Sequence, residues 1–187
     1  MKVRRFTLAA VCCALLAGAG SIKAQGYYDP PGVADALGGI SSQRAAATTI
    51  TFDRQMLDAM LGGGDRAADF NGVSFEHYQY SEPVFYIPEE IHALEQAYHA
   101  AGWSHLIDSK VGPRESASPT KPIADIWFHW QGGEIDHVTV LIRGRKDMNV
   151  VHVSGVLRPM DLVHISGHFG IPKVDPGAVM VPAPPGR

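Results

Sequence analysis

The side chains of this chain that could do chemistry are mainly imidazoles and carboxylates, and the sequence holds nine histidines. His92, Glu95 and His99 are spaced three and four residues apart, so in a helix they share one face, a geometry that can ligate a metal ion. Zinc sites need three or four protein ligands, and the sequence indicates none from another element. We therefore interpret these residues as the solvated side of a helix and expect no metal site.

A second pair of histidines, His137 and His152, falls on neighbouring strands of a predicted sheet. Their rings could approach each other, but no carboxylate is obviously supplied, and a general base also needs an oriented substrate pocket. A pH-sensitive contact surface is the alternative, because an unperturbed imidazole has a pKa of about 6.5. We interpret Asp125 and Asp136 as strand ends in water and not as a catalytic pair.

Two motifs have the spacing of known sites without the required context. Ser118-Pro119-Thr120-Lys121 matches the S-x-x-K of serine acyl enzymes, but that motif begins a helix, and the prolines here predict a loop. Gly62-Gly63-Gly64 lacks the P-loop pattern and is interpreted as a helix terminator. We expect no catalytic residue and no cofactor, and the sequence disfavours an enzyme without excluding one.

Residues 1–24 have the three parts of a secretory signal: a basic start, the apolar run Phe6–Gly20 and a short polar end that closes on Ala24. We expect cleavage there, because about 15 apolar residues are short of the roughly 20 that span a bilayer. Cys12 and Cys13 lie inside this signal, so the mature chain is expected to have no disulfide and no thiol catalyst. The predicted location is the periplasm or the cell exterior, without a membrane anchor.

The composition fits one modest globular core. The chain has 187 residues, of which 45% are hydrophobic and 19% charged, which excludes both a multidomain enzyme and a wholly disordered chain. The net charge is −3 although the signal is basic, so the remainder is more acidic. Without a basic cluster to neutralise phosphates, the chain is not expected to bind nucleic acid.

The distribution of Gly, Pro and Ser divides the chain. Gln25–Arg44 is predicted to be a flexible linker, residues 45–170 a single α+β domain, and Ile171–Arg187 a Pro-rich mobile tail. Periodicity within the domain predicts strands over 49–52, 72–80 and 103–111, helices from Asp53 and over 88–102, a loop over 112–122, and a last helix from Arg158. We expect a mainly antiparallel sheet of about five strands with two to three helices packed on one face.

The most informative stretch is a predicted three-stranded meander over residues 125–156. Strands 126–131 and 134–143 flank Gly132-Gly133, a pair that tolerates the positive φ of a two-residue hairpin turn. That turn predicts the facing pairs Trp127–Val138, Phe128–His137 and His129–Asp136.

Side chains alternate across strands, so this register sorts the meander into two faces. The face assigned to the core beneath the helices carries Trp127, Val138, Val140, Ile142, Val151 and Val153. The opposite, open face carries Ile126, Phe128, Trp130, Ile135, His137, Thr139, Leu141, Val150 and His152. Such a face is too apolar for a solvated surface, and large exposed apolar patches mark interfaces. The predicted partner-binding residues are Phe128, Trp130, His137, Leu141, Val150 and His152.

The run IDHVTVLIRGRKDMNVVHVSG, followed by VLRPMDLVHISGHFGIP, resembles the end of the exported bacterial domain-of-unknown-function family 4252. The upstream segments ITFDRQMLDAML, GVSFEHYQY and GWSHLI fit the same pattern, so the resemblance covers about residues 49–172. It rests on a hydrophobic pattern, with Trp103 and Gly155 as its most particular residues. The resemblance implies an exported, non-enzymatic envelope protein and no catalytic residue.

Two functional hypotheses follow. The first is a non-enzymatic interaction or signalling-accessory module, whose open sheet face binds an envelope protein or a second copy of the chain. The second is a small-ligand-binding or metal-assisted enzyme domain that uses the sheet histidines. A further alternative is that another element covers the face as ordinary core.

Overall fold

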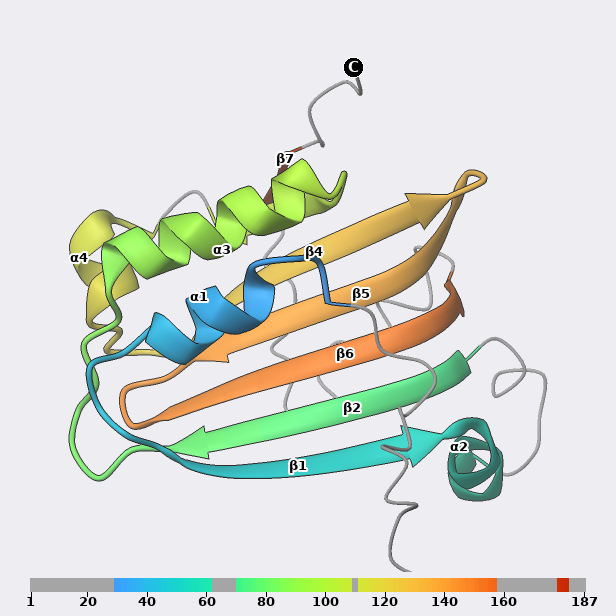
Figure 1. The fold of residues 1–187 in the computed structure, drawn as a ribbon, viewed down its shortest axis with the longest axis horizontal. Coiled ribbons are helices and arrows are strands. Elements are labelled where there is room, and N and C mark those ends of the chain that lie inside the picture. The colour runs from blue at the N-terminus through green and yellow to red at the C-terminus, as the bar shows by residue number, and fades with distance from the viewer. Residues whose placement is uncertain (1–28, 62–69, 109–110, 158–177, 182–187) are drawn as a thin grey trace, which may run out of the picture.

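The computed structural model describes residues 29–61, 70–108, 111–157 and 178–181 (Figure 1). The predicted signal segment 1–24, the glycines 62–64 and the helix predicted from Arg158 lie outside the described residues. No helix of the described part combines the length and the apolar character needed to cross a membrane.

One antiparallel sheet of seven strands forms the body of the molecule, in the order β1-β2-β6-β5-β4-β3-β7. The strands are β1 (Ala46–Asp53), β2 (Phe70–Gln79), β3 (Ser104–Asp108), β4 (Ile123–Gln131), β5 (Glu134–Arg143), β6 (Asp147–Leu157) and β7 (Ala178–Val181). The α+β class and the antiparallel sheet are confirmed, although the sheet has more strands than the five expected.

The helices α1 (Val33–Gly39) and α3 (Pro88–Ala100) lie across one side of the sheet, with the short α4 (Pro113–Ala117) beyond the start of α3 (Figure 1). We call this side the helix face and the other side the far face. The prediction of α3 is confirmed: Pro88 occupies its first turn, Glu89 and Glu90 follow at the positive end of the helix dipole, and Gly102 turns the chain with a φ of 83°.

Apolar residues pack on both sides of the sheet. On the helix face, α1 and α3 form one core with residues of the sheet, among them Trp127, Leu141 and Val150. On the far face, a second core contains Ile126, Val140 and Val151 together with Leu57 of α2 (Arg54–Leu61).

The predicted face assignment of the meander is wrong because of a single residue. The two-residue turn at Gly132 and Gly133 is present, with φ of 62° and 91°, and Trp130 pairs with Ile135, as such a turn requires. The register then shifts, so that His129 pairs with His137 and Asp136 is the extra residue of a β-bulge. A shift of one residue moves every following side chain to the opposite face.

The bulge therefore changes which residues of β5 and β6 share a face with each β4 side chain. The residues Val138, Val140, Ile142, Val151 and Val153, which were predicted to lie beneath the helices, belong instead to the far-face core with Ile126 and Phe128. The helix face carries Trp127, as predicted, together with Leu141 and Val150, which were predicted on the opposite side.

The proposed linker and tail also differ from the prediction. Within the segment expected to be a flexible linker, Val33 and Ala36 of α1 and Ile40, which follows the helix, are buried in the helix-face core with residues of α3. Within the segment expected to be a mobile tail, β7 pairs antiparallel with β3. The predicted loop 112–122 contains α4.

Candidate functional site

Three side chains capable of binding a metal ion come together at the bulge. His129, Asp136 and His137 each offer one ligand atom, and these atoms lie within 4.8 Å of one another. Nδ1 of His129 lies 2.6 Å from Oδ1 of Asp136, and Nδ1 of His137 lies 3.1 Å from Oδ2. The carboxylate thus bridges two imidazoles on neighbouring strands. We call these three residues the bulge cluster.

The bulge explains how these three functional groups meet on one hairpin. In regular alternation Asp136 and His137 point to opposite faces of β5, so a carboxylate that contacts His129 could not also reach the ring of His137. As the extra residue, Asp136 is released from this alternation and contacts both His129 and its own neighbour His137. The fold therefore builds the cluster from one hairpin, without a ligand from a helix.

Trp103 forms one wall of the bulge cluster. Its ring centroid lies 5.4 Å from that of His129 and 6.2 Å from that of His137. The chain reaches this position because Gly102 ends α3 in a left-handed conformation and the Trp103 N–H donates to the Tyr98 carbonyl. Trp103 is buried, so the two histidine rings rest on a fixed indole.

The bulge cluster is only partly shielded from solvent. The side chains of His129, Asp136 and His137 are 30%, 22% and 26% exposed. Burial raises the pKa of Asp136, but the hydrogen bonds and charges of the two histidines outweigh it, so the pKa lies below its usual value. The carboxyl group is therefore an anion at neutral pH and available to a cation.

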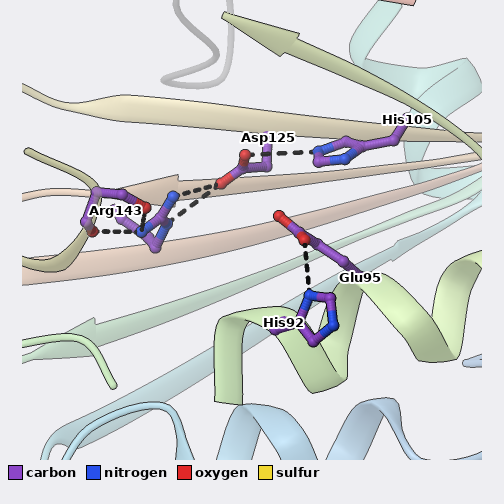
Figure 2. A network of polar contacts seen from close by, with 6 residues as sticks. His92, Glu95, His105, Asp125 and Arg143 are labelled. Carbon is purple, nitrogen blue, oxygen red and sulfur yellow. Dashed lines mark hydrogen bonds and ion pairs between the residues drawn. The ribbon is translucent and has the colours of Figure 1, made fainter. Parts of the chain in front are cut away.

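A second cluster, which also contains an aspartate and a histidine, is buried on β3, β4 and β5 (Figure 2). Arg143 donates to Oδ2 of Asp125 from Nη2 at 2.9 Å and from Nε at 3.2 Å, and its Nη1 donates to the carbonyl and hydroxyl oxygens of Ser116. On the other side of the carboxylate, Nε2 of His105 lies 3.5 Å from Oδ1. We call His105, Asp125 and Arg143 the buried cluster.

The electrostatics of the buried cluster are those of a desolvated ion pair. Burial raises the pKa of Asp125, but the contact with His105 and the charge of Arg143 outweigh it and lower the pKa. The Arg143 guanidinium also lies over the Tyr86 ring, 5.6 Å from its centroid. All three members are almost inaccessible to solvent, which indicates a structural role. The interpretation of Asp125 as a strand end in water is therefore wrong.

The predicted pair His137 and His152 does not face each other across β5 and β6. The rings lie on the same face, but His137 pairs with Ser154 and His152 pairs with Thr139. Nδ1 of His152 lies 3.1 Å from the Thr139 hydroxyl, and burial lowers the pKa of His152 to about 3. His152 is therefore a neutral core residue at physiological pH.

The helical triple His92, Glu95 and His99 is likewise not assembled into a site. The exposed His92 pairs with the partly buried Glu95 on α3 at 3.6 Å (Figure 2). His99 contacts the ring of His105, with centroids 6.3 Å apart. The interpretation of this stretch as a largely solvated helix side therefore agrees with the geometry for His92 and Glu95.

The six predicted partner-binding residues do not form one open face. Phe128 is buried in the far-face core, Leu141 and Val150 are buried in the helix-face core, and His152 is buried beside Thr139. His137 is partly exposed in the bulge cluster, and Trp130, at 43%, is the exposed member of the set. The register shift at Asp136 is the physical reason, because it distributes these residues over both covered faces.

Sequence reasoning missed His129 and Asp136 as functional candidates. The predicted register did place these two residues opposite each other, so their proximity was available from the turn alone. The proximity of His137 to these two residues could not be predicted from the turn, because it depends on the bulge.

Searches of protein-family models, curated protein sequences and solved structures find no match to this chain. The candidate site therefore rests on its own geometry.

Proposed function

We propose that this protein binds a divalent transition-metal ion through His129, Asp136 and His137. The observation that carries this proposal is the bulge, which brings two imidazoles and an anionic carboxylate within 4.8 Å of one another on one hairpin. The proposal corresponds to the second functional hypothesis, a ligand-binding domain that uses the sheet histidines, with His152 replaced by His129 and Asp136.

The donor set selects a class of ion. Imidazole nitrogen suits zinc, copper, nickel and iron, whereas calcium and magnesium prefer sites made of oxygen ligands. Three protein ligands leave at least one coordination position for water or a small ligand, as in catalytic and transport sites. The partial exposure of all three side chains supports entry of an ion from solvent.

The geometry also supports a rigid site. Trp103 holds both rings from one side, and the strand pairing of His129 with His137 fixes their backbone separation. Preorganised ligands lose little conformational entropy on binding, which favours affinity. The competing interpretation is a structural hydrogen-bonded trio that takes no ion.

Isothermal titration of the full chain with zinc chloride tests the proposal. We expect one equivalent of zinc to bind, and Asp136→Asn and His137→Gln each to weaken binding at least about tenfold, because each removes a ligand. His92→Gln is the matched control, since His92 is also an imidazole beside a carboxylate but lies on α3.

Binding to the His92→Gln protein should equal that of the unmodified chain. Circular dichroism of every variant establishes that it is folded. Equal zinc affinity in all three variants, or no zinc binding by the unmodified chain, would contradict the proposal.

Export from the cytoplasm and the resemblance to family 4252 stay predictions from the sequence. If both predictions hold, the protein binds the metal ion in the cell envelope. The interaction-module hypothesis in its original form loses its support, because the residues assigned to the open face are mostly buried.

A further inference from the structure

Strand β1 forms one edge of the sheet and differs from ordinary edge strands (Figure 1). Its eight residues pair with β2 in an unbroken register, from Ala46 with Gln79 to Asp53 with Gly72, without a bulge. Among the described strands, none pairs with its outer side. Nearly every residue of β1 is exposed.

The sequence of β1 lacks the features that protect edges. Natural edge strands carry lysine, proline, inward-pointing charges or bulges that prevent another chain from pairing with them. Residues 45–52 contain no charge and no proline. At the centre of the strand, Ile50 is 47% exposed, one of the few large apolar side chains of the described part that is so open.

Ile50 also ends a row of side chains that crosses the whole far face. Pairing connects Ile50 to Phe75, Phe75 to Val151, Val151 to Val140, and Val140 to Ile126. Four members of this row, from Phe75 to Ile126, belong to the far-face core or pack against it. The row therefore extends from the core to the edge and stops at an exposed isoleucine.

We propose that β1 pairs with β1 of a second copy of this chain, antiparallel about a two-fold axis that passes beside Ile50. In this register the numbers of two facing residues sum to about 100. Facing side chains then lie on the same side of the continuous sheet. Ile50 faces Ile50 of the copy, so the apolar row of one molecule continues directly into that of the other. Thr49 faces Thr51, and these threonines can bond across the junction.

The charges at the ends of β1 favour a second copy in this orientation. Arg44 precedes the strand and Asp53 ends it. Antiparallel pairing brings the basic end of one strand towards the acidic end of the other and places Asp53 opposite Ala47. Parallel pairing would set Asp53 against Asp53, which is destabilising. The opposite edge of the sheet offers a shorter template, because β7 has four residues.

Sedimentation velocity of the full chain over a range of concentrations tests the pairing. We expect the mass of two copies, and a return to the mass of one copy in Ile50→Lys, because the lysines of the two copies would face each other. Trp130→Lys is the matched control, since Trp130 is similarly exposed but lies on β4. It should remain dimeric.

A monomer in the unmodified chain, or a dimer that Trp130→Lys dissociates and Ile50→Lys does not, would overturn the proposal. Thermal unfolding of each variant excludes a loss of fold as the cause.

Cysteine cross-linking tests the register on a parent chain in which Cys12 and Cys13 are serine. Ile50→Cys should oxidise to a covalent dimer, because the two Cα atoms face each other within disulfide range. Thr48→Cys should not, because residue 48 faces residue 52 of the copy. The two cysteines would then be four residues, or about 13 Å, apart along the strand. Cross-linking of Thr48→Cys but not of Ile50→Cys would contradict the stated pairing.

Discussion

The bulge cluster and the buried cluster use the same chemical groups in opposite ways. Each contains an aspartate that contacts a histidine on a neighbouring strand, and both aspartates have a lowered pKa. In the buried cluster the second partner of the carboxylate is Arg143, a permanent cation. In the bulge cluster it is His137, an imidazole whose ring nitrogen is a metal-ligand type.

This difference determines what each cluster can do. The carboxylate of Asp125 is already neutralised by an arginine and sealed from solvent, so it has no capacity for an added cation. The carboxylate of Asp136 is held by two imidazoles at a position that solvent reaches, and all three groups are of types that bind metal ions. An aspartate beside a histidine therefore belongs to a structural ion pair in one place and to a candidate metal site in the other.

The largest expected effect comes from breaking the buried cluster. Asp125→Asn should lower the free energy of unfolding by about 3–5 kcal/mol, because it leaves the Arg143 guanidinium buried without its anion. Urea unfolding at neutral pH measures this loss. A decrease below about 1 kcal/mol would show that Asp125 and Arg143 are not the desolvated pair described here.

The buried imidazole of His152 should produce the next largest effect, as a dependence of stability on pH. Its pKa is about 3 in the folded protein and about 6.5 in the unfolded chain, so between these values the unfolded chain binds the extra proton. Its contribution to stability is complete above pH 6.5 and is lost as the pH falls towards 3, by up to about 1.4 kcal/mol per pH unit.

His152→Gln should reduce this slope, while His92→Gln, at an exposed position, should leave it unchanged. Urea unfolding at a series of pH values between 7 and 4 measures both. Equal slopes in the unmodified chain and in His152→Gln would mean that His152 is not buried as a neutral ring.

The smallest effect on stability is expected at the bulge cluster. Asp136→Asn should cost no more than about 1 kcal/mol of unfolding free energy without metal, because the three side chains stay partly solvated. It should, however, abolish the rise in melting temperature that zinc gives the unmodified chain. A loss of unfolding free energy as large as that of Asp125→Asn would show that the bulge cluster stabilises the fold in the same way as the buried cluster.

The parts of the fold that the sequence predicted are those with local signals. The helix that begins at Pro88 carries its own first-turn proline, acidic residues and terminal glycine. The turn at Gly132 and Gly133 needs two positive φ angles, and two consecutive glycines predict such a turn because glycine adopts these angles readily. These features arise from backbone preferences within a few residues and do not depend on distant packing.

The bulge at Asp136 carried no comparable signal. Asp136 is not a glycine, and its neighbours continue the alternation of a regular strand, so a regular register was the natural expectation. Because one extra residue reverses the two faces, a single missed bulge misplaced most of the predicted interaction surface. It also concealed the convergence of His129 and His137.

Two other differences had weak signals in the sequence. Val33, Ala36 and Ile40 are spaced as one face of a helix, but the surrounding glycines and prolines favoured a linker. Asp125 stands between apolar residues of β4, and its partner Arg143 is eighteen residues away. Only the pairing of β4 with β5 reveals that contact.

The measurement that tests the central claim most directly is anomalous diffraction at the zinc absorption edge from crystals soaked in zinc. The account predicts an anomalous peak about 2.0–2.2 Å from a nitrogen of His129, a nitrogen of His137 and an oxygen of Asp136. Zinc bound beside His92 and Glu95 instead, or a zinc-soaked crystal in which the bulge cluster shows no anomalous peak, would contradict it.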